Sequence, residues 1–183
     1  VEYNKELGKG KLTALVGTTF QSNTSTTNTI NGTNYNNDAL LGSISAAGTL
    51  SGSTRYDNYN FSSIFGRVTY NYQGKYILNA TMRRDGSSRF GLNNSFGNFG
   101  AIGAAWIFSV ETFVKDNFSF LSFGKLRGSY GITGNDQISN YQNLATYSAA
   151  GSTSGYQGIT IQNPARLANP DIKWESNRKA ELA

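Results

Sequence analysis

Two alternating runs joined by a short glycine turn most constrain what this chain can fold into. Residues 61–72 and 75–85 each place apolar and polar side chains at alternate positions, and Gln73-Gly74 separates the two runs. Alternation with a period of two is typical of a strand with one apolar face, and so short a Gly-containing connection favours an antiparallel pair. The sequence therefore predicts a β-hairpin that turns at residues 73–74.

Four further segments of strand length accompany this hairpin. Several exceed the roughly 5–6 residues of an average soluble strand and approach the roughly 9–11 residues with which a strand crosses a bilayer. A short helix is predicted at residues 109–117, with Ser109 as its cap. The four segments are residues 11–20, 96–108, 121–133 and 172–183.

The connections between these strands differ greatly in length. Residues 21–60 and 134–171 are long and rich in Asn, Thr, Ser and Gly, whereas residues 73–74 and 109–119 are short. Outer-membrane barrels have short periplasmic turns and longer external loops. The pattern therefore predicts two extracellular loops and two periplasmic turns, although a soluble all-β carbohydrate-binding or adhesion module would show the same alternation of faces and stays open as an alternative.

The composition narrows the function by what it lacks. The chain contains no Cys and no His, which excludes disulfides, thiolate metal sites, a Ser-His-Asp triad and a Cys nucleophile. Nothing in the sequence fixes Asp136, Asp171 or Glu175 at the spacing that a glycosidase pair needs. We expect no enzyme activity, no metal and no cofactor.

Charge and hydropathy exclude two further classes. The net charge is +5, but the Lys and Arg residues are scattered along the chain, whereas a nucleic-acid face clusters them. We therefore expect no binding to nucleic acid. Residues 1–11 carry no apolar signal-peptide core, and no run approaches the roughly 18 apolar residues of a membrane helix.

Three motifs follow one another in the chain: DGSSRFG at residues 85–91, LRGSYGITGNDQISNY at 126–141 and NPDIKWE at 169–175. In this order they resemble the SusC/RagA family of TonB-dependent outer-membrane transporters of Bacteroidetes. The resemblance covers roughly residues 61–175 and implies an all-β fold, an antiparallel transmembrane β-barrel. Residues 1–183 would supply about six strands of a large plugged barrel of about 22 strands, without its plug domain.

The same resemblance implies a function and a set of partners. Members of the family import oligosaccharides or peptides through the outer membrane of Gram-negative cells. TonB supplies the energy through an N-terminal region that this chain lacks, and a SusD-like surface lipoprotein covers the external mouth. The barrel wall itself is expected to contact outer-membrane lipid.

Candidate functional residues lie on the polar side of the predicted strands and in the loops beside them. Each has a structural alternative: a strand-to-loop turn for Asp85, lumen-side pairing with acidic residues on neighbouring strands for the arginines, and an interfacial aromatic belt for Trp106 and Trp174. The residues expected to face the lumen or the plug are Arg67, Asn79, Arg83, Lys125 and Arg127. The loop residues that could contact a ligand are Asp85, Arg89, Asp136 and Trp174.

Overall fold

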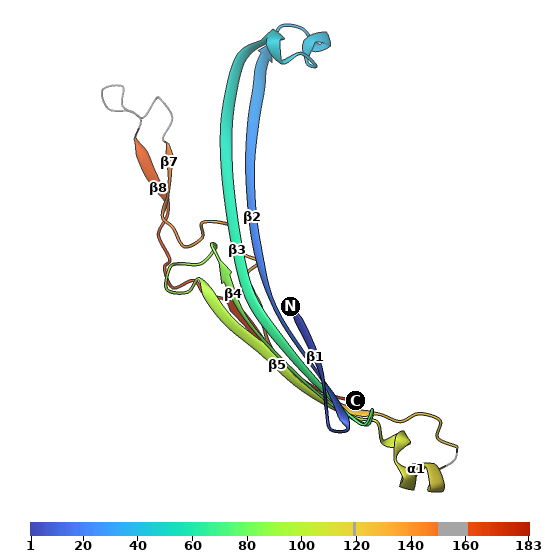
Figure 1. Ribbon diagram of the computed structural model, residues 1–183. Helices are drawn as coiled ribbons and strands as arrows, with labels where there is room; N and C mark the ends of the chain where they lie inside the picture. The colour runs from blue at the N-terminus through green and yellow to red at the C-terminus, as the bar shows by residue number, and fades with distance from the viewer. Residues whose placement is uncertain (119, 150–160) are drawn as a thin grey trace. The chain divides into compact units, whose positions relative to one another are not determined.

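An antiparallel sheet dominates the chain. The computed structural model describes residues 1–118, 120–149 and 161–183. Within them, seven strands form one sheet in the order β1-β2-β3-β4-β5-β6-β9, and a separate pair is formed by β7 and β8 (Figure 1). The strands of the large sheet are β1 (Glu2–Leu7), β2 (Gly10–Tyr35), β3 (Ala47–Tyr72), β4 (Tyr76–Ser87), β5 (Phe96–Trp106), β6 (Leu126–Asn135) and β9 (Glu175–Leu182).

The predicted hairpin is present between β3 and β4. Lys75 N donates to Tyr72 O at 3.0 Å, and the two residues inside this turn, Gln73 and Gly74, have φ of 55° and 68°. Positive φ at both central residues gives the turn the twist that suits a hairpin. The strands pair Tyr72 with Tyr76, so the connection is one residue longer than the predicted two-residue turn.

The strands present chemically different residues to the two faces of the sheet. The register aligns Val68, Ala80, Ile102 and Tyr130 across four strands, and alternate residues point to the opposite face. Large apolar side chains stay uncovered: Met82 is 69% exposed. We call the side that carries the row of Val68 the apolar face, and it includes Ile64, Val68, Leu78, Met82, Ile102 and Tyr130. The other side, the polar face, includes Arg67, Thr69, Asn79, Thr81, Arg83 and Ser129.

The chain divides into two compact units, one of Val1–Gln21 with Phe61–Ala183 and one of Ser22–Asn60. The second unit contains the distal parts of β2 and β3, with the 3-10 helices η1 (Asp38–Leu40) and η2 (Ile44–Ala46) between them. Thr54 Oγ1 donates to Asn28 Oδ1 at 2.9 Å, and Asn34 Nδ2 donates to Thr49 Oγ1 at 3.1 Å. Such side-chain pairs and β-branched Thr favour strands, so the long polar connection predicted at residues 21–60 consists largely of the continued strands β2 and β3.

Other predicted boundaries also differ from the structure. Residues 2–7 form a strand that the sequence analysis did not predict, because EYNKEL carries little apolar alternation. The predicted strand at residues 121–133 begins only at Leu126, and the one at 172–183 begins only at Glu175. The predicted loop at residues 134–171 contains β7 (Thr146–Ala149) and β8 (Gln162–Arg166); its residues 150–160 lie outside the described residues.

The connection from β5 to β6 contains two short helical segments. They are η3 (Phe108–Val110) and α1 (Thr112–Asn117). The predicted cap Ser109 lies inside η3, and the residue that precedes α1 is Glu111, whose side chain makes no capping hydrogen bond. That carboxylate has other partners, described below. No helix within the described residues is long and apolar enough to cross a membrane.

Candidate functional site

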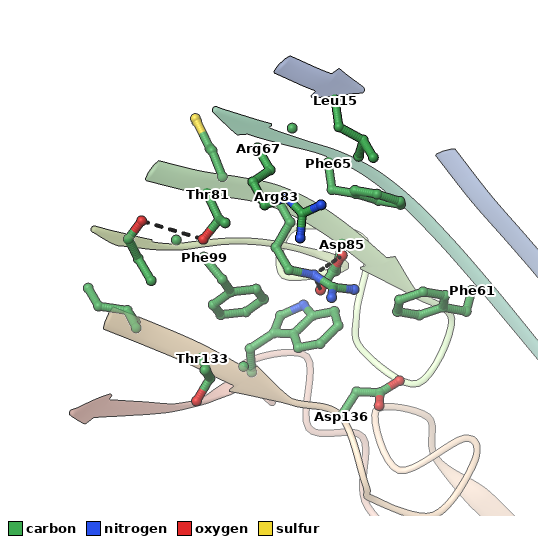
Figure 2. Close-up of a pocket in the computed structure, with 17 residues that line it drawn as sticks. Leu15, Phe61, Phe65, Arg67, Thr81, Arg83, Asp85, Phe99, Thr133 and Asp136 are labelled. Carbon is green, nitrogen blue, oxygen red and sulfur yellow. Dashed lines mark hydrogen bonds and ion pairs between the residues drawn. The ribbon is translucent and has the colours of Figure 1, made fainter. Parts of the chain in front are cut away.

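A hollow of about 750 Å³ lies against the sheet within the larger unit. Strands β2 to β6 supply most of its walls, and the segments that follow β6 and precede β9 supply Asp136 and Trp174. Its volume falls in the range of small-molecule sites, roughly 300–1,000 Å³. Figure 2 shows the labelled arginines, Arg67 and Arg83, among the aromatic rings of the site. The lining residues that the argument uses are Phe65, Arg67, Arg83, Asp85, Phe99 and Asp136.

One carboxylate of the hollow is buried and fully engaged. Asp85 is 5% exposed, and Arg83 Nε donates to both of its oxygens, at 3.0 and 2.7 Å. Ser63 Oγ donates to Asp85 Oδ1 at 2.5 Å. Because a buried carboxylate needs compensating donors, this triad fixes the end of β4. Asp85 and Gly86 lie within β4 and pair with β5, so they do not form the turn considered from the sequence. Arg83 does pair with an acid, but with one on its own strand and not on a neighbouring strand.

The second carboxylate of the hollow belongs to the loop after β6. Arg89 Nη1 lies 3.9 Å from Asp136 Oδ1 and donates to the Asp136 carbonyl at 2.9 Å. Arg89 Nε also donates to Asn140 Oδ1 at 3.0 Å. Arg89 therefore joins the DGSSRFG and GITGNDQISNY motifs, and both predicted loop residues hold the two segments together.

Trp174 completes this arrangement from the third motif. Its ring centroid lies 4.9 Å from that of Phe90 and 5.3 Å from that of Phe99. Trp174 Nε1 donates to Ser95 O at 3.3 Å, and Phe90 and Phe99 are among the few buried hydrophobic residues of the described chain. Trp174 thus packs among loop and strand residues, unlike the interfacial belt considered from the sequence. We name residues 85–91, 134–141 and 169–174 the motif cluster.

The remaining predicted residues lie elsewhere on the polar face. Asn79, Lys125 and Arg127 line a smaller hollow of about 250 Å³ with Glu181. Asn79 Oδ1 also accepts a hydrogen bond from Thr69 Oγ1 at 2.9 Å. The structure therefore brings Arg67, Arg83, Asp85, Asp136 and Trp174 together in the larger hollow and keeps Asn79, Lys125 and Arg127 apart from them.

A polar cluster lies at the turn end of the sheet. Glu111 accepts hydrogen bonds from Lys75 Nζ at 2.8 Å, Tyr76 Oη at 2.8 Å and Trp106 Nε1 at 3.3 Å. The bond from Lys75, followed by that from Tyr76, lowers the pKa of Glu111 below its ordinary value of 4.5. Trp106 also stacks on Tyr76, with the centroids 6.4 Å apart. We call these four residues the Glu111 cluster.

Some residues of the hollow were missed from the sequence. Phe65 and Phe99 lie on the polar face, where the alternation rule leads one to expect polar side chains. The register aligns them on either side of Arg83. The available signal was an aromatic residue out of phase with its strand, at Phe65 beside Ile64 and at Phe99 in the FGNFG run.

Comparison with known proteins shows to which family the chain belongs. No family model matches the chain. The chain is 35% identical over 176 residues to TonB-dependent receptor P39 of Formosa agariphila, covering 94% of this chain and 17% of that receptor. It is 37% identical over 117 residues to TonB-dependent receptor SusC of Bacteroides thetaiotaomicron, covering 62% of this chain and 12% of SusC. This chain belongs to the SusC/RagA-like TonB-dependent receptors.

The structural comparison agrees with the SusC/RagA-like assignment. The RagAB peptide importer in its closed-closed state matches with a TM-score of 0.80 at 26% identity, over 99% of this chain and 20% of that chain. The antiparallel sheet is therefore a segment of a TonB-dependent receptor barrel. The chain spans less than a fifth of the length of the curated relatives P39 and SusC.

Proposed function

We propose that this chain forms part of the wall of an outer-membrane, TonB-dependent nutrient importer. The observation that carries the proposal is the contrast between the two faces of one sheet. Ile102 on the apolar face is 62% exposed, although it lies in the middle of β5. Burying such side chains against lipid tails is favourable at about 25 cal/mol per Å². The apolar face suits lipid, and the polar face suits the lumen of the barrel.

The soluble alternative receives no such support. A soluble β-sandwich buries its apolar face against a second sheet. Within the described residues the other sheet is the pair of β7 and β8, with strands of 4 and 5 residues. That pair is too small to cover the apolar sides of β3, β4, β5 and β6.

The connections support an orientation in the membrane. Gln73 N donates to Lys9 O at 3.0 Å, and Ile107 N donates to Lys75 O at 2.8 Å. The connections before β2, between β3 and β4, and after β5 therefore lie at one end of the sheet. We place this end, with residues 73–74 and 109–119, in the periplasm. The segments at residues 21–60 and 134–171 then belong to the extracellular side.

The family resemblance supports a proposal for the partners and the substrate. The solved relative is described as a peptide importer, and we extend the cargo of this receptor to oligosaccharides or peptides. A SusD-like lipoprotein at the external mouth and energy from TonB complete the proposed machine. The polar-face residues, Arg67 and Arg83 among them, would face the passage or the plug.

Matched substitutions on the two faces test the barrel wall. We expect Met82→Lys to cost about 2–4 kcal/mol if Met82 lies near the bilayer midplane, and so to deplete folded receptor from the outer membrane. The neighbour Thr81→Lys points to the polar face and should leave the amount of folded receptor near that of the wild type. Heat-modifiable gel mobility of outer-membrane fractions measures both. Equal depletion by the two substitutions would contradict the assignment of the faces.

Transport is tested in the host cell. Deleting the receptor gene should abolish TonB-dependent uptake of at least one labelled peptide or oligosaccharide, and the restored gene should recover it. Unchanged uptake of every compound in such a panel would show that import is not its function.

A further inference from the structure

We propose that the larger hollow is a subsite for a carboxylate of the imported substrate, with Arg67 as the cation that binds it. The inference deepens the proposed function and rests on it. The ligand class is a peptide with a free carboxylate, at its C-terminus or on an acidic side chain. The hollow would hold that group together with the apolar part of the same residue.

The balance of charge in the hollow leaves Arg67 available. The carboxylate of Asp85 is paired with Arg83 at 2.7 Å, and that of Asp136 lies 3.9 Å from Arg89. Across residues 1–118, 120–149 and 161–183, Arg67 makes no hydrogen bond or ion pair. Both acids of the hollow thus already have an arginine, and Arg67 adds an uncompensated positive charge.

The register explains why space is open beside this arginine. Arg67 is aligned with Thr81, Ala101 and Gly131 on the three following strands. Because the side chains of Thr81, Ala101 and Gly131 are short, they leave open space on the polar face beside the long side chain of Arg67. Thr81 Oγ1 is turned toward the backbone, since it lies 3.4 Å from Ala101 O as a donor. The guanidinium can therefore meet a ligand group with its planar set of donors, which matches a carboxylate in geometry.

Aromatic and cationic residues form the next row of the hollow. Phe65, Arg83 and Phe99 are aligned across β3, β4 and β5. Arg83 is a diagonal neighbour of Arg67, but its charge is paired with Asp85, so Arg67 supplies the free positive charge of the hollow. The rings give apolar contact next to the cation, which suits an amino-acid side chain beside a carboxylate. Trp174 is already packed on Phe90 and Phe99, which makes it a poor platform for a sugar ring.

The position along the strands also favours a substrate over a periplasmic partner. The hollow includes Thr81, Met82, Arg83 and Asp85 of β4, whose other end starts at Tyr76 beside the turn. In the proposed orientation this is the half of the strand nearer the outside, where cargo enters.

The test uses the complete receptor, purified in detergent from its host membrane. The probes are pairs of labelled peptides that differ only in a free or an amidated C-terminus, or in Glu or Gln at one position. Affinity is measured for the wild type, Arg67→Gln, Arg67→Lys and a control, Arg84→Gln. Arg84 is adjacent to Arg83 in sequence but lies on the opposite face, over Phe96 at 5.1 Å. The substitution Arg84→Gln therefore removes one positive charge, as Arg67→Gln does, but outside the hollow.

We expect the wild type to prefer the carboxylate member of a pair, and Arg67→Gln to lose that preference by on the order of tenfold. Arg67→Lys should keep part of it, and Arg84→Gln should keep all of it. The preference should also weaken as salt is raised. Unchanged preference in Arg67→Gln would overturn the subsite.

Two further outcomes separate the subsite from the proposed function. If Arg67→Gln lowers the melting temperature of the ligand-free receptor and leaves the preference unchanged, the receptor's own interior holds this cation, and the proposal is wrong. Uptake by cells carrying the wild type is measured in parallel. Uptake without any carboxylate preference overturns the subsite alone, whereas absence of both uptake and binding overturns the importer as well.

Discussion

The two ends of the sheet in the larger unit are held by different chemistry. The motif cluster buries the rings of Phe90 and Phe99, and Trp174 reaches them from a segment far along the chain. The Glu111 cluster instead gathers three donors around one carboxylate. Apolar burial depends little on pH and salt, whereas ionic hydrogen bonds depend on both. We therefore expect the aromatic contacts of the motif cluster to respond less to pH and salt than the Glu111 cluster does.

The comparison also explains what the family motifs do. The three stretches that resemble the SusC/RagA family supply partners for one another: Arg89 for Asp136, and Phe90 for Trp174. These motifs are packing partners at one end of the barrel wall. Their presence in one sequence marks a shared architecture.

The prediction with the largest expected effect concerns the buried ring of Phe90. We expect Phe90→Ala to lower the free energy of local opening at the motif cluster by about 3–5 kcal/mol. Hydrogen exchange of the Ser87 and Asn94 amides, which bond to Ser95 O and Gly91 O, reports on this end. Phe120→Ala is the control, because Phe120 is 84% exposed. If Phe90→Ala accelerates hydrogen exchange of the Lys75 and Ile107 amides at the turn end equally, the two ends are not independent and the comparison between them is wrong.

A smaller effect is expected at the buried carboxylate. Asp85→Ala leaves Arg83 and Ser63 without their acceptor, which should cost about 1–3 kcal/mol at the same amides. Asp85→Asn keeps one acceptor oxygen and should cost less. If the two substitutions have the same effect, the hydrogen bonds of this group do not contribute to the stability of the motif cluster.

At the turn end, the backbone itself can be tested. Gly74 has φ of 68°, a conformation in which an L-residue is strained, so Gly74→Ala should cost about 1–2 kcal/mol. Faster exchange of the Lys75 amide, which bonds to Tyr72 O, measures this. Gly42→Ala serves as the control, since no atom lies within 4 Å of the added methyl group and its φ is not positive. Similar losses in both variants would rule out strain at the turn.

The smallest expected effect is a dependence on pH. The pKa of Glu111 is lowered in the folded chain, so its ionised carboxylate stabilises the turn end fully at pH values above 4.5. This stabilisation is lost as the pH falls through the lower pKa of the folded chain. The Ile107 amide should therefore lose protection in acid, after correction for intrinsic exchange. Glu111→Gln should remove this pH dependence, and Lys75→Gln should reduce it. An acid response that persists in Glu111→Gln would assign it to another group.

Sequence patterns predicted the centre of the fold well and its margins poorly. The hairpin at Gln73-Gly74 was confirmed because alternation and turn chemistry both act locally. The continuation of β2 to Tyr35 was missed, since a polar Thr and Asn ribbon satisfies its hydrogen bonds with its partner strand and needs no apolar face. β1 was missed for the same reason.

For the site, the sequence indicated residue types but not their grouping. Arg83 and Asp85 lie two positions apart on one face of a strand, so their pairing follows from the period of the strand. The contacts of Arg89 with Asp136 and of Trp174 with Phe90 join segments separated by long connections. Local patterns do not encode such contacts. The roles of Arg67, Asn79, Arg83, Lys125 and Arg127 at the lumen stay a prediction.

The length of β2 and β3 has a consequence for how receptors of this kind can diversify. Each strand has 26 residues, more than twice the roughly 9–11 that cross a bilayer. Inserting two residues in each strand of the Ser22–Asn60 unit would lengthen this two-stranded ribbon by about 6.6 Å. All the original side chains would stay on the faces that they now occupy. A single inserted residue would reverse the faces beyond it. The ribbon can therefore gain or lose length in even steps, while the pairing of β3 with β4 stays unchanged.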